Sequence, residues 1–232
     1  MDNVFDNPIA IQLFEHSTLL QSWNAEDKHR VKEHAKTFSW DTGQLLFSRG
    51  DPARWLYIVI SGSVKGVVFS EDGHEAIIDL AGPGQWFGGL SIIDQQPHPQ
   101  TAVALEPTLC LALDGLIIRE VLEANPSLYR DVVFMLCQRL RSTFSWIEDS
   151  LLGSVQDRIF KRLQDIALSI GERHEDGFII QSRLSQDALA SMLGVTRQTL
   201  NKALGELRAQ GQVKKVGNQY WVRNSESSHG SH

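Results

Sequence analysis

Cysteine is nearly absent from this chain of 232 residues, which contains only Cys110 and Cys137. Two cysteines cannot build the disulfide framework of a small secreted protein, and one chain cannot offer four thiolates to an iron–sulfur cluster. We therefore expect a protein of the reducing cytosol. Because both cysteines lie in largely apolar surroundings in the sequence, we also expect both thiols to be buried and inert.

Long apolar runs are absent as well. No stretch approaches the roughly 20 residues that a membrane-spanning helix needs, and residues 1–6 lack the basic-then-apolar order of a secretory signal. These absences predict a cytoplasmic protein without a membrane partner. The hydrophobic content of 42% is enough for two packed domains.

A metal-binding histidine cluster is the third absence. A metal-dependent oxygenase of the cupin kind needs a His-x-His pair with a downstream carboxylate and a third histidine, and no such pattern occurs. This argues against an enzyme. His74 and His98 are the histidines of the β-rich region, but a turn and a loop are poor positions for a haem ligand, so the cofactor stays unknown.

Two short helices are predicted within residues 186–204, joined at Gly194. Ala190 is small where the helices must cross, and Gly194 occupies a turn in which a positive φ costs glycine little. This layout is typical of a helix-turn-helix, whose second helix lies in the DNA major groove. The apolar residues expected to lock the two helices together are Leu189, Leu193, Val195, Leu200 and Ala203.

The second of these helices has an apolar side and a polar side. Thr196 is its predicted N-cap. Its apolar residues recur at the i, i+3, i+4, i+7 spacing of a buried stripe, at Leu200, Ala203, Leu204 and Leu207. The polar side is then free to meet bases, and it carries Arg197, Gln198, Asn201, Lys202 and Arg208.

A β-hairpin and a local excess of positive charge follow. The strand-like runs 212–216 and 219–222 flank Gly217-Asn218, a two-residue turn signal, and together with the two helices they predict a winged helix. Residues 178–223 hold seven bases and two acids, a net charge of +5, whereas the rest of the chain carries −11 within a total of −6. A basic module on an acidic body predicts double-stranded DNA as a partner.

Short β-rich runs dominate the first two thirds of the chain. Glycines recur there at steps of 12, 11 and 11 (residues 50, 62, 73 and 84), and turn-forming residues separate the runs. This spacing predicts a jelly-roll barrel, preceded by short helices in residues 9–37. The predicted strands are 55–60, 64–69, 75–80, 101–105 and 109–113.

A long helix is predicted from about residue 125 to residue 152. Its apolar residues alternate at steps of 4 and 3, the a/d seam of a two-stranded coiled coil, and they are Val133, Cys137, Leu140, Phe144, Ile147 and Leu151. Burial of this seam against the chain's own barrel is the alternative. We favour a homodimer, because two-fold symmetric proteins read palindromic operators. Gly153-Ser154 then predicts a hinge before a further helix over residues 155–170.

Barrel, long helix, hinge and winged helix in this order resemble the cyclic-AMP receptor / fumarate–nitrate regulator (CRP/FNR) family of bacterial transcription factors. The resemblance spans about residues 45–222, and its most specific segments are 46–51, 56–64, 84–90 and 196–202. It implies an α+β fold with an N-terminal double-stranded β-helix (jelly-roll, cyclic-nucleotide-binding-like) barrel. The implied parts are a barrel domain with N-terminal helices (1–124), a dimerisation helix (125–152), a winged helix-turn-helix (153–224) and a disordered tail (225–232).

The resemblance also implies which residues read the DNA. Three positions of the family's second helix contact bases, and they fall here on Arg197, Gln198 and Lys202. Arg197 suits guanine and Gln198 suits adenine, each through two hydrogen bonds, while Lys202 reaches a guanine or a phosphate. The other residues predicted to bind DNA are Thr196, Thr199, Asn201 and Ser185.

An effector site in the barrel is the second implication, and here the chain departs from the cyclic-AMP binders. Gly89 and Gln100 replace the glutamate that holds the ribose and the arginine that neutralises the phosphate. A lost charge-assisted bond costs about 1.5–3 kcal/mol, so we expect an unknown effector other than cyclic AMP. The predicted effector-binding residues are Trp86, Phe87, Gly88, Gly89, Leu90, Ser91, Gln100, Thr101, Thr143 and Phe144.

Two alternatives stay open. Aromatic side chains could fill a vacant barrel, which would make the protein a constitutive DNA-binding regulator; a cyclic-AMP-responsive regulator is less favoured. RNA polymerase is a further candidate partner, although we recognise no surface signature for it. In the favoured interpretation the effector alters the packing of residues 133–151, and the hinge near Gly153 sets two recognition helices about 34 Å apart.

Overall fold

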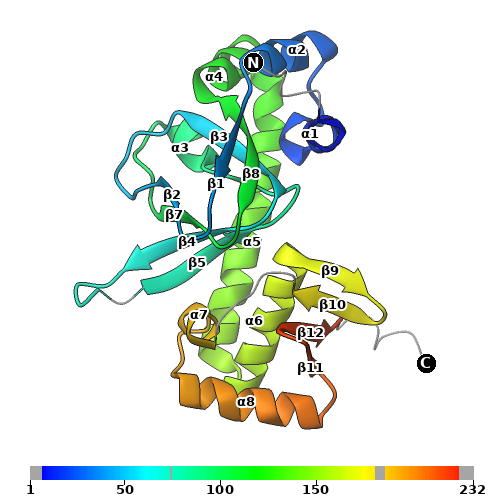
Figure 1. Ribbon diagram of the computed structural model, residues 1–232. Helices are drawn as coiled ribbons and strands as arrows, with labels where there is room; N and C mark the ends of the chain where they lie inside the picture. The colour runs from blue at the N-terminus through cyan, green and yellow to red at the C-terminus, as the bar shows by residue number, and fades with distance from the viewer. Residues whose placement is uncertain (1–6, 74, 181–185, 225–232) are drawn as a thin grey trace. The chain divides into compact units, whose positions relative to one another are not determined.

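The structure, a computed structural model, describes residues 7–73, 75–180 and 186–224 (Figure 1). By its internal contacts the chain forms two compact units, one of Met1–Gly66 with Ala81–Ser142 and the other of Val67–Leu80 with Thr143–His232. The domain limits expected from the sequence stay predictions. The elements of the first half are α1 (Pro8–Glu15), η2 (Thr18–Leu20), α2 (Ala25–Glu33), β1 (Lys36–Trp40), β2 (Leu45–Phe47), β3 (Trp55–Ser61), β4 (Val64–Phe69), β5 (Glu75–Ala81), β6 (Trp86–Phe87), α3 (Gly89–Asp94), β7 (Thr101–Ala104) and β8 (Thr108–Asp114).

Two four-stranded sheets form the barrel, with strand orders β1-β8-β3-β6 and β2-β7-β4-β5 (Figure 1). All five predicted strands are confirmed to within two residues at their ends. The helical region expected to reach residue 37 ends earlier, because α2 stops at Glu33 and β1 starts at Lys36. The reason is an alternation in β1, where Phe38 and Trp40 turn toward the barrel core while Thr37 and Ser39 are polar and exposed.

The sheet β1-β8-β3-β6 separates two apolar cores. Tyr57 of β3 is paired with Ala112 of β8 and with Phe87 of β6, and this row faces the inside of the barrel. Leu56 and Ile58 alternate with Tyr57 and pack on the other face, in a core shared with the helices. Gly62, after β3, has φ +81°, and a Cβ there would lie 2.4 Å from the carbonyl oxygen of Pro107, so this tight approach requires glycine.

Helices follow the barrel: α4 (Gly115–Ala124), η3 (Pro126–Leu128), α5 (Tyr129–Leu152) and α6 (Val155–Ile170). The predicted interruption at residues 153–154 is confirmed. Ser154 ends it as the N-cap of α6, and its side chain accepts a hydrogen bond from the N–H of Asp157 at 3.1 Å. Buried residues of α6 recur with helical periodicity, at Ile159, Leu163, Ile166, Ala167 and Ile170, and give this helix one inward face.

The carboxy-terminal part is a winged helix. Its sheet has the order β11-β12-β10-β9, built from β9 (Gly171–His174), β10 (Gly177–Ile180), β11 (Val213–Val216) and β12 (Gln219–Arg223). The helices α7 (Gln186–Met192) and α8 (Arg197–Ala209) lie between β10 and β11 in the chain. The predicted hairpin around Gly217-Asn218 is confirmed, since β11 and β12 are antiparallel and pair Val216 with Gln219.

Candidate nucleic-acid interface

The turn between α7 and α8 has the geometry that the sequence predicts. Gly194 has φ +60°, a left-handed conformation that favours glycine. The N–H of Leu193 donates to the carbonyl of Leu189, and the N–H of Val195 donates to that of Ala190, so backbone hydrogen bonds close the turn. Leu189, Ala190 and Leu200 are buried, which fixes the angle between the two helices.

The helix α8 begins at the predicted residue and buries the predicted side. Thr196 is its N-cap, and the hydroxyl accepts a hydrogen bond from the N–H of Thr199 at 3.2 Å. The predicted apolar stripe is fully buried: Leu200, Ala203, Leu204 and Leu207. The opposite side exposes Arg197, Gln198, Asn201 and Lys202, so the predicted base-reading side chains share one accessible face.

Arg197 is held by two residues of α7 that the sequence did not single out. Its Nε donates to Oε1 of Gln186 at 3.2 Å, and Nη1 lies 3.6 Å from Oδ1 of Asp187. The Arg197 side chain is nevertheless 62% exposed. An i to i+11 contact across a turn has no periodic signature, and only the fold brings these groups together. Ser185, also predicted to bind DNA, lies outside the described residues.

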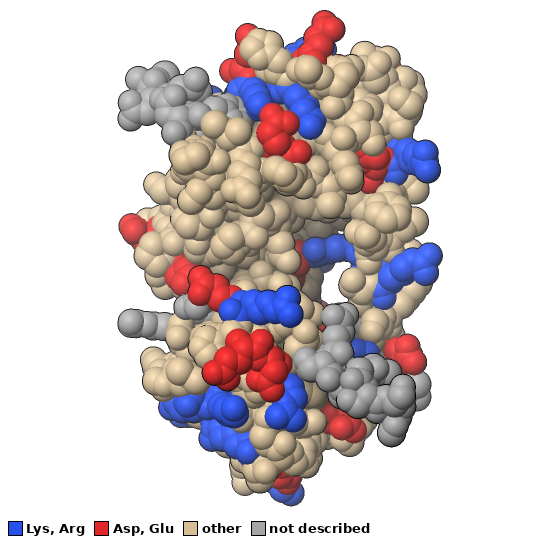
Figure 2. Space-filling model, turned by 90° about the vertical axis from the view of Figure 1, so that its right-hand side faces the viewer, with Lys and Arg blue, Asp and Glu red and all other residues tan. Residues whose placement is uncertain are grey.

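Further cations lie on the wing. Lys214 and Lys215 of β11 are exposed, and Nζ of Lys214 lies 4.4 Å from the centre of the Trp221 ring. Such a contact holds a flexible cation near the sheet. Basic and acidic side chains are intermixed on the face that Figure 2 presents.

The residues predicted to bind an effector have unequal environments. Phe87, Gly89, Ser91 and Thr101 are buried, Trp86, Gly88 and Gln100 are half-buried, and Leu90, Thr143 and Phe144 are exposed. Gly88 has φ +76° and caps α3. The hydroxyl of Thr101 already accepts a hydrogen bond from the N–H of Arg49, at 2.9 Å.

Gly89 lies in a closed position. A Cβ at this residue would lie 2.9 Å from Leu56 Cδ1 and 2.9 Å from Trp86 Cζ3, which is too close for either atom to stay in place. A longer side chain at Gly89 therefore requires Trp86 to move. The packing around Gly89 therefore agrees with the absence, in this chain, of the glutamate that the cyclic-AMP binders carry at this position.

His98 is the histidine that the structure makes informative. It lies in a loop, as predicted, but it is only 4% exposed and stacks on Phe47 with ring centres 3.7 Å apart and planes inclined by 12°. Burial lowers the pKa of His98, and the nearby charge of Asp51 opposes this shift. The ring is therefore part of the barrel core rather than a solvated loop side chain. His74, the other haem candidate, lies outside the described residues.

The two cysteines differ, and the prediction that both are buried is wrong for Cys137. Cys110 is fully buried in the barrel, and burial raises the pKa of its thiol to about 12, so it is inert as predicted. Cys137 is exposed because it lies on the outer side of α5, away from the barrel core.

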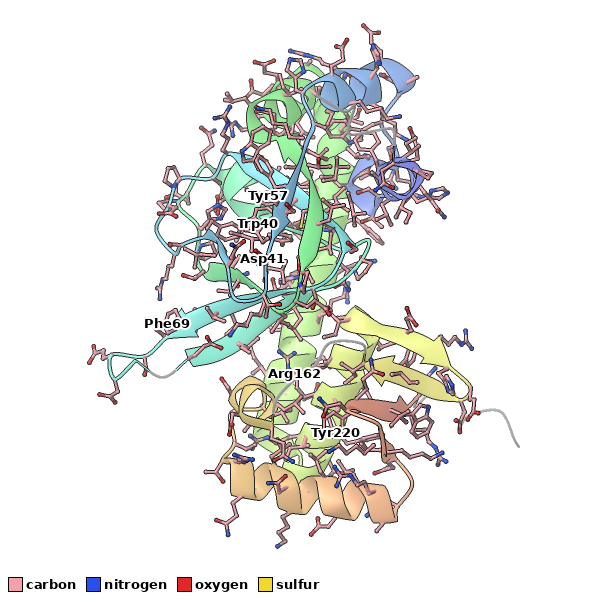
Figure 3. The ribbon with its side chains drawn as sticks, in the orientation of Figure 1. Trp40, Asp41, Tyr57, Phe69, Arg162 and Tyr220 are labelled. Atoms are coloured by element: carbon pink, nitrogen blue, oxygen red, sulfur yellow. The ribbon has the colours of Figure 1, made fainter. Side chains whose placement is uncertain are left out.

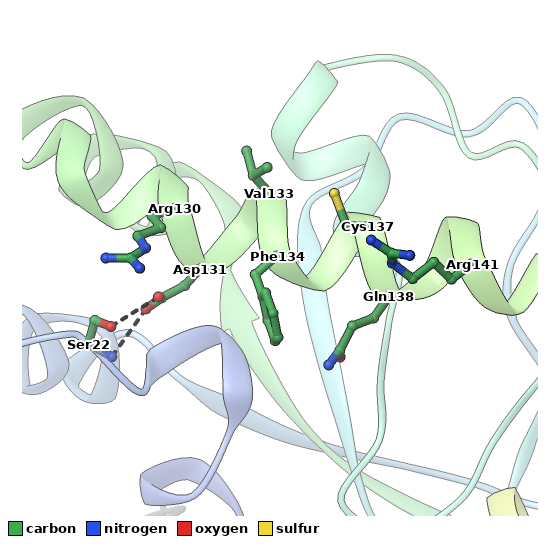
Figure 4. A pocket seen from close by; sticks show the side chains of 8 residues that line it. All are labelled: Ser22, Arg130, Asp131, Val133, Phe134, Cys137, Gln138 and Arg141. Atoms are coloured by element: carbon green, nitrogen blue, oxygen red, sulfur yellow. Dashed lines mark hydrogen bonds between the residues drawn. The ribbon is translucent and has the colours of Figure 1, made fainter.

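A pocket of about 560 Å³ runs along this outer side of α5 (Figure 4). One end is closed by Asp131, whose carboxylate accepts hydrogen bonds from the N–H of Ser22 at 3.1 Å and from its hydroxyl at 2.9 Å. The pocket combines apolar and cationic side chains. Its lining residues are Ser22, Arg130, Asp131, Val133, Phe134, Cys137, Gln138 and Arg141.

Comparison with known proteins defines the class. Residues 37–125 match the cyclic nucleotide-binding domain family, and residues 157–227 match the Crp-like helix-turn-helix domain family. A "CRP-like cAMP-activated global transcriptional regulator" of Mycobacterium tuberculosis is 29% identical over 184 residues, which cover 79% of this chain and 82% of that protein. A "Global nitrogen regulator" of Synechococcus elongatus is 29% identical over 171 residues, covering 73% of this chain and 77% of the relative.

A solved structure has a similar fold. FixK2 from Bradyrhizobium japonicum superimposes with a TM-score of 0.72 at 22% identity, covering 84% of this chain and 96% of that one. The barrel and the helix-turn-helix thus define a DNA-binding transcription regulator that carries a domain of the cyclic nucleotide-binding family. The chain belongs to the CRP/FNR family of regulators. Its relatives are regulators and not enzymes, in agreement with the prediction that it has no catalytic role.

Residues 7–73, 75–180 and 186–224 contain no group of three or more histidine, cysteine, aspartate or glutamate side chains placed to hold a metal ion. No helix in the same ranges is long and apolar enough to cross a membrane.

Proposed function

We propose that this regulator acts as a homodimer, in which α8 of each copy reads one half of a palindromic operator, and that a small molecule other than cyclic AMP gates it through the barrel. The observation that carries base reading is the division of α8, whose stripe Leu200–Leu207 is buried while Arg197, Gln198 and Lys202 are exposed. A guanidinium, an amide and an ammonium on one face match the hydrogen-bonding edges of the major groove.

The exposed apolar face of α5 supports the homodimer. Val133, Leu140 and Phe144 are 56%, 52% and 60% exposed, and Cys137 and Ile147 are exposed on the same seam. The side chain of Leu151, the last residue of the predicted seam, lies outside the described residues. An exposed apolar stripe of this length on a helix indicates an interaction surface. Its 4 and 3 spacing favours the same helix of a second copy.

A charge placed in the seam tests the dimer. Leu140→Glu removes the two leucines that the proposed dimer would bury, each worth at most about 1.5–3 kcal/mol, and places a charge in the seam. The variant should be monomeric in sedimentation experiments. Ser142→Glu is the matched control, because Ser142 is exposed on the same helix but off the seam. A Leu140→Glu protein that sediments like the parent chain would refute the proposed interface.

The packing around Gly89 and Thr101 supports an effector other than cyclic AMP. Trp86 and Leu56 close the position of the missing glutamate, and the Thr101 hydroxyl is already engaged by the backbone of Arg49. Gln100 also offers no positive charge for a phosphate. Cyclic AMP should therefore fail to bind at micromolar concentration in calorimetry, and tight binding would contradict the proposal.

The constitutive alternative has a specific observation in its favour, namely the stacked rings inside the barrel. Tyr57 and Phe87 stack with ring centres 5.0 Å apart, and Phe47 stacks on both. Operator affinity should be measured with and without a metabolite extract, on a site selected from random DNA. Unchanged affinity would favour the constitutive regulator, whereas a shift would favour gating.

A further inference from the structure

The barrel contains an aromatic cluster whose members are not among the residues predicted to bind an effector, although Tyr57 stacks on one of those residues, Phe87, with ring centres 5.0 Å apart. It consists of Phe38, Trp40, Trp55 and Tyr57, drawn from β1 and β3. Ring centres lie 5.7 Å apart for Phe38 and Trp55 and 5.8 Å apart for Trp40 and Tyr57, and Figure 3 labels the last two side by side. Because β8 places the small residues Cys110 and Ala112 between β1 and β3, the rings on the outer strands can approach each other.

The members of the cluster differ in burial. Phe38, Trp40 and Trp55 are half-buried although they pack on the barrel core, whereas Tyr57 is only 7% exposed. The Tyr57 hydroxyl forms no hydrogen bond with any residue that the structure describes. Burial, with a smaller contribution from Cys110, raises the pKa of Tyr57 to about 12, so this hydroxyl stays protonated as a donor.

Two cations lie against one ring of the cluster, that of Trp55. Nζ of Lys36 lies 5.5 Å from the centre of the Trp55 ring, and Cζ of Arg54 lies 5.0 Å from it. Both side chains are exposed, and neither forms an ion pair with a carboxylate among the described residues. The nearest acid by register, Asp114 opposite Trp55, is used as the N-cap of α4. The charge beside the rings is therefore free for an anion.

We propose that this aromatic cluster binds a planar aromatic carboxylate, with the ring against the half-buried aromatic side chains and the carboxylate at Lys36 and Arg54. Rings of this size favour flat partners through offset or edge contacts. The unpaired cations favour an anionic substituent. As an effector class this rests on the proposed gating through the barrel, but binding itself requires neither DNA nor a dimer.

Binding of 2-naphthoate to the full chain is measured by calorimetry and by tryptophan fluorescence. We compare it with 2-naphthol, which lacks the charge, and with octanoate, which lacks the ring. We expect 2-naphthoate to bind more tightly than either 2-naphthol or octanoate. Trp40→Leu should weaken 2-naphthoate roughly 2- to 10-fold. The double variant Lys36→Gln with Arg54→Gln should reduce its affinity to that of 2-naphthol.

The control is Arg130→Gln, which removes an exposed charge on α5, outside the cluster, and should leave affinity unchanged. Should Trp40→Leu fail to fold, Trp40→Phe and the exposed cation variants carry the test. Equal binding of octanoate and 2-naphthoate, no binding of 2-naphthoate, or insensitivity to the Trp40 and Lys36/Arg54 changes would overturn the inference. Binding of 2-naphthoate without an effect on operator affinity would leave this site standing and refute only the gating.

Discussion

Replacing Arg197 with alanine is the most direct test of how this protein reads DNA. The side chain is 62% exposed, and its ion pair with Asp187 is open to solvent, so its loss should change the free energy of unfolding by less than about 0.5–1 kcal/mol. The effect on specific binding should be larger. A bidentate contact to guanine is worth about 1–3 kcal/mol, or roughly 5- to 150-fold in affinity.

The assay is fluorescence anisotropy on a selected operator and on random DNA of equal length, at several salt concentrations. A base-reading arginine affects the operator and barely affects random DNA. A phosphate-binding arginine weakens both equally and lowers the slope of log affinity against log salt by about 0.9. Arg208→Ala is the matched control, because Arg208 is exposed near the other end of the same helix and is not one of the three residues assigned to base contacts. Equal losses on both DNAs for Arg197→Ala would refute the assignment.

Three further predictions concern stability. Burial lowers the pKa of His98 below its value in the unfolded chain, so below about pH 6.5 the unfolded chain binds more protons than the folded one. The contribution of His98 to the free energy of unfolding is therefore present above that pH and lost below it. His98→Phe keeps a ring against Phe47 and should flatten the loss between pH 7.5 and 5.5 in urea titrations; an unchanged slope would contradict this. Thr196→Ala should cost about 1 kcal/mol of unfolding free energy through its N-cap, and Thr196→Ser should restore most of it in the same titrations. Gly194→Ala should destabilise the fold by roughly 1 kcal/mol, because φ at this residue is +60°. Gly205 is helical and has open space where a Cβ would lie, so Gly205→Ala should stabilise the fold by up to about 1 kcal/mol. Thermal melts in which both variants shift the melting temperature in the same direction would contradict this backbone argument.

The order of elements and the recognition helix could be predicted from the sequence because their signals are local. A positive φ at Gly194, a cap at Thr196 and a buried stripe from Leu200 to Leu207 each depend on neighbours within a few residues. Five barrel strands, β3, β4, β5, β7 and β8, could be predicted in the same way, from turn residues and β-rich runs. β1, β2 and β6 could not. In β1, Phe38 and Trp40 alternate with polar residues, but so short an alternation is a weak signal.

What only the tertiary structure decided are contacts between distant segments. The register that pairs Phe38 with Cys110 brings rings of β1 to those of β3, and it leaves Lys36 and Arg54 beside Trp55. The burial of His98 on Phe47, the exposure of Cys137 on α5 and the hold of α7 on Arg197 have the same origin. Hydrophobic periodicity states which side of a segment is apolar, but not which other segment covers it, and that choice is made by packing in three dimensions.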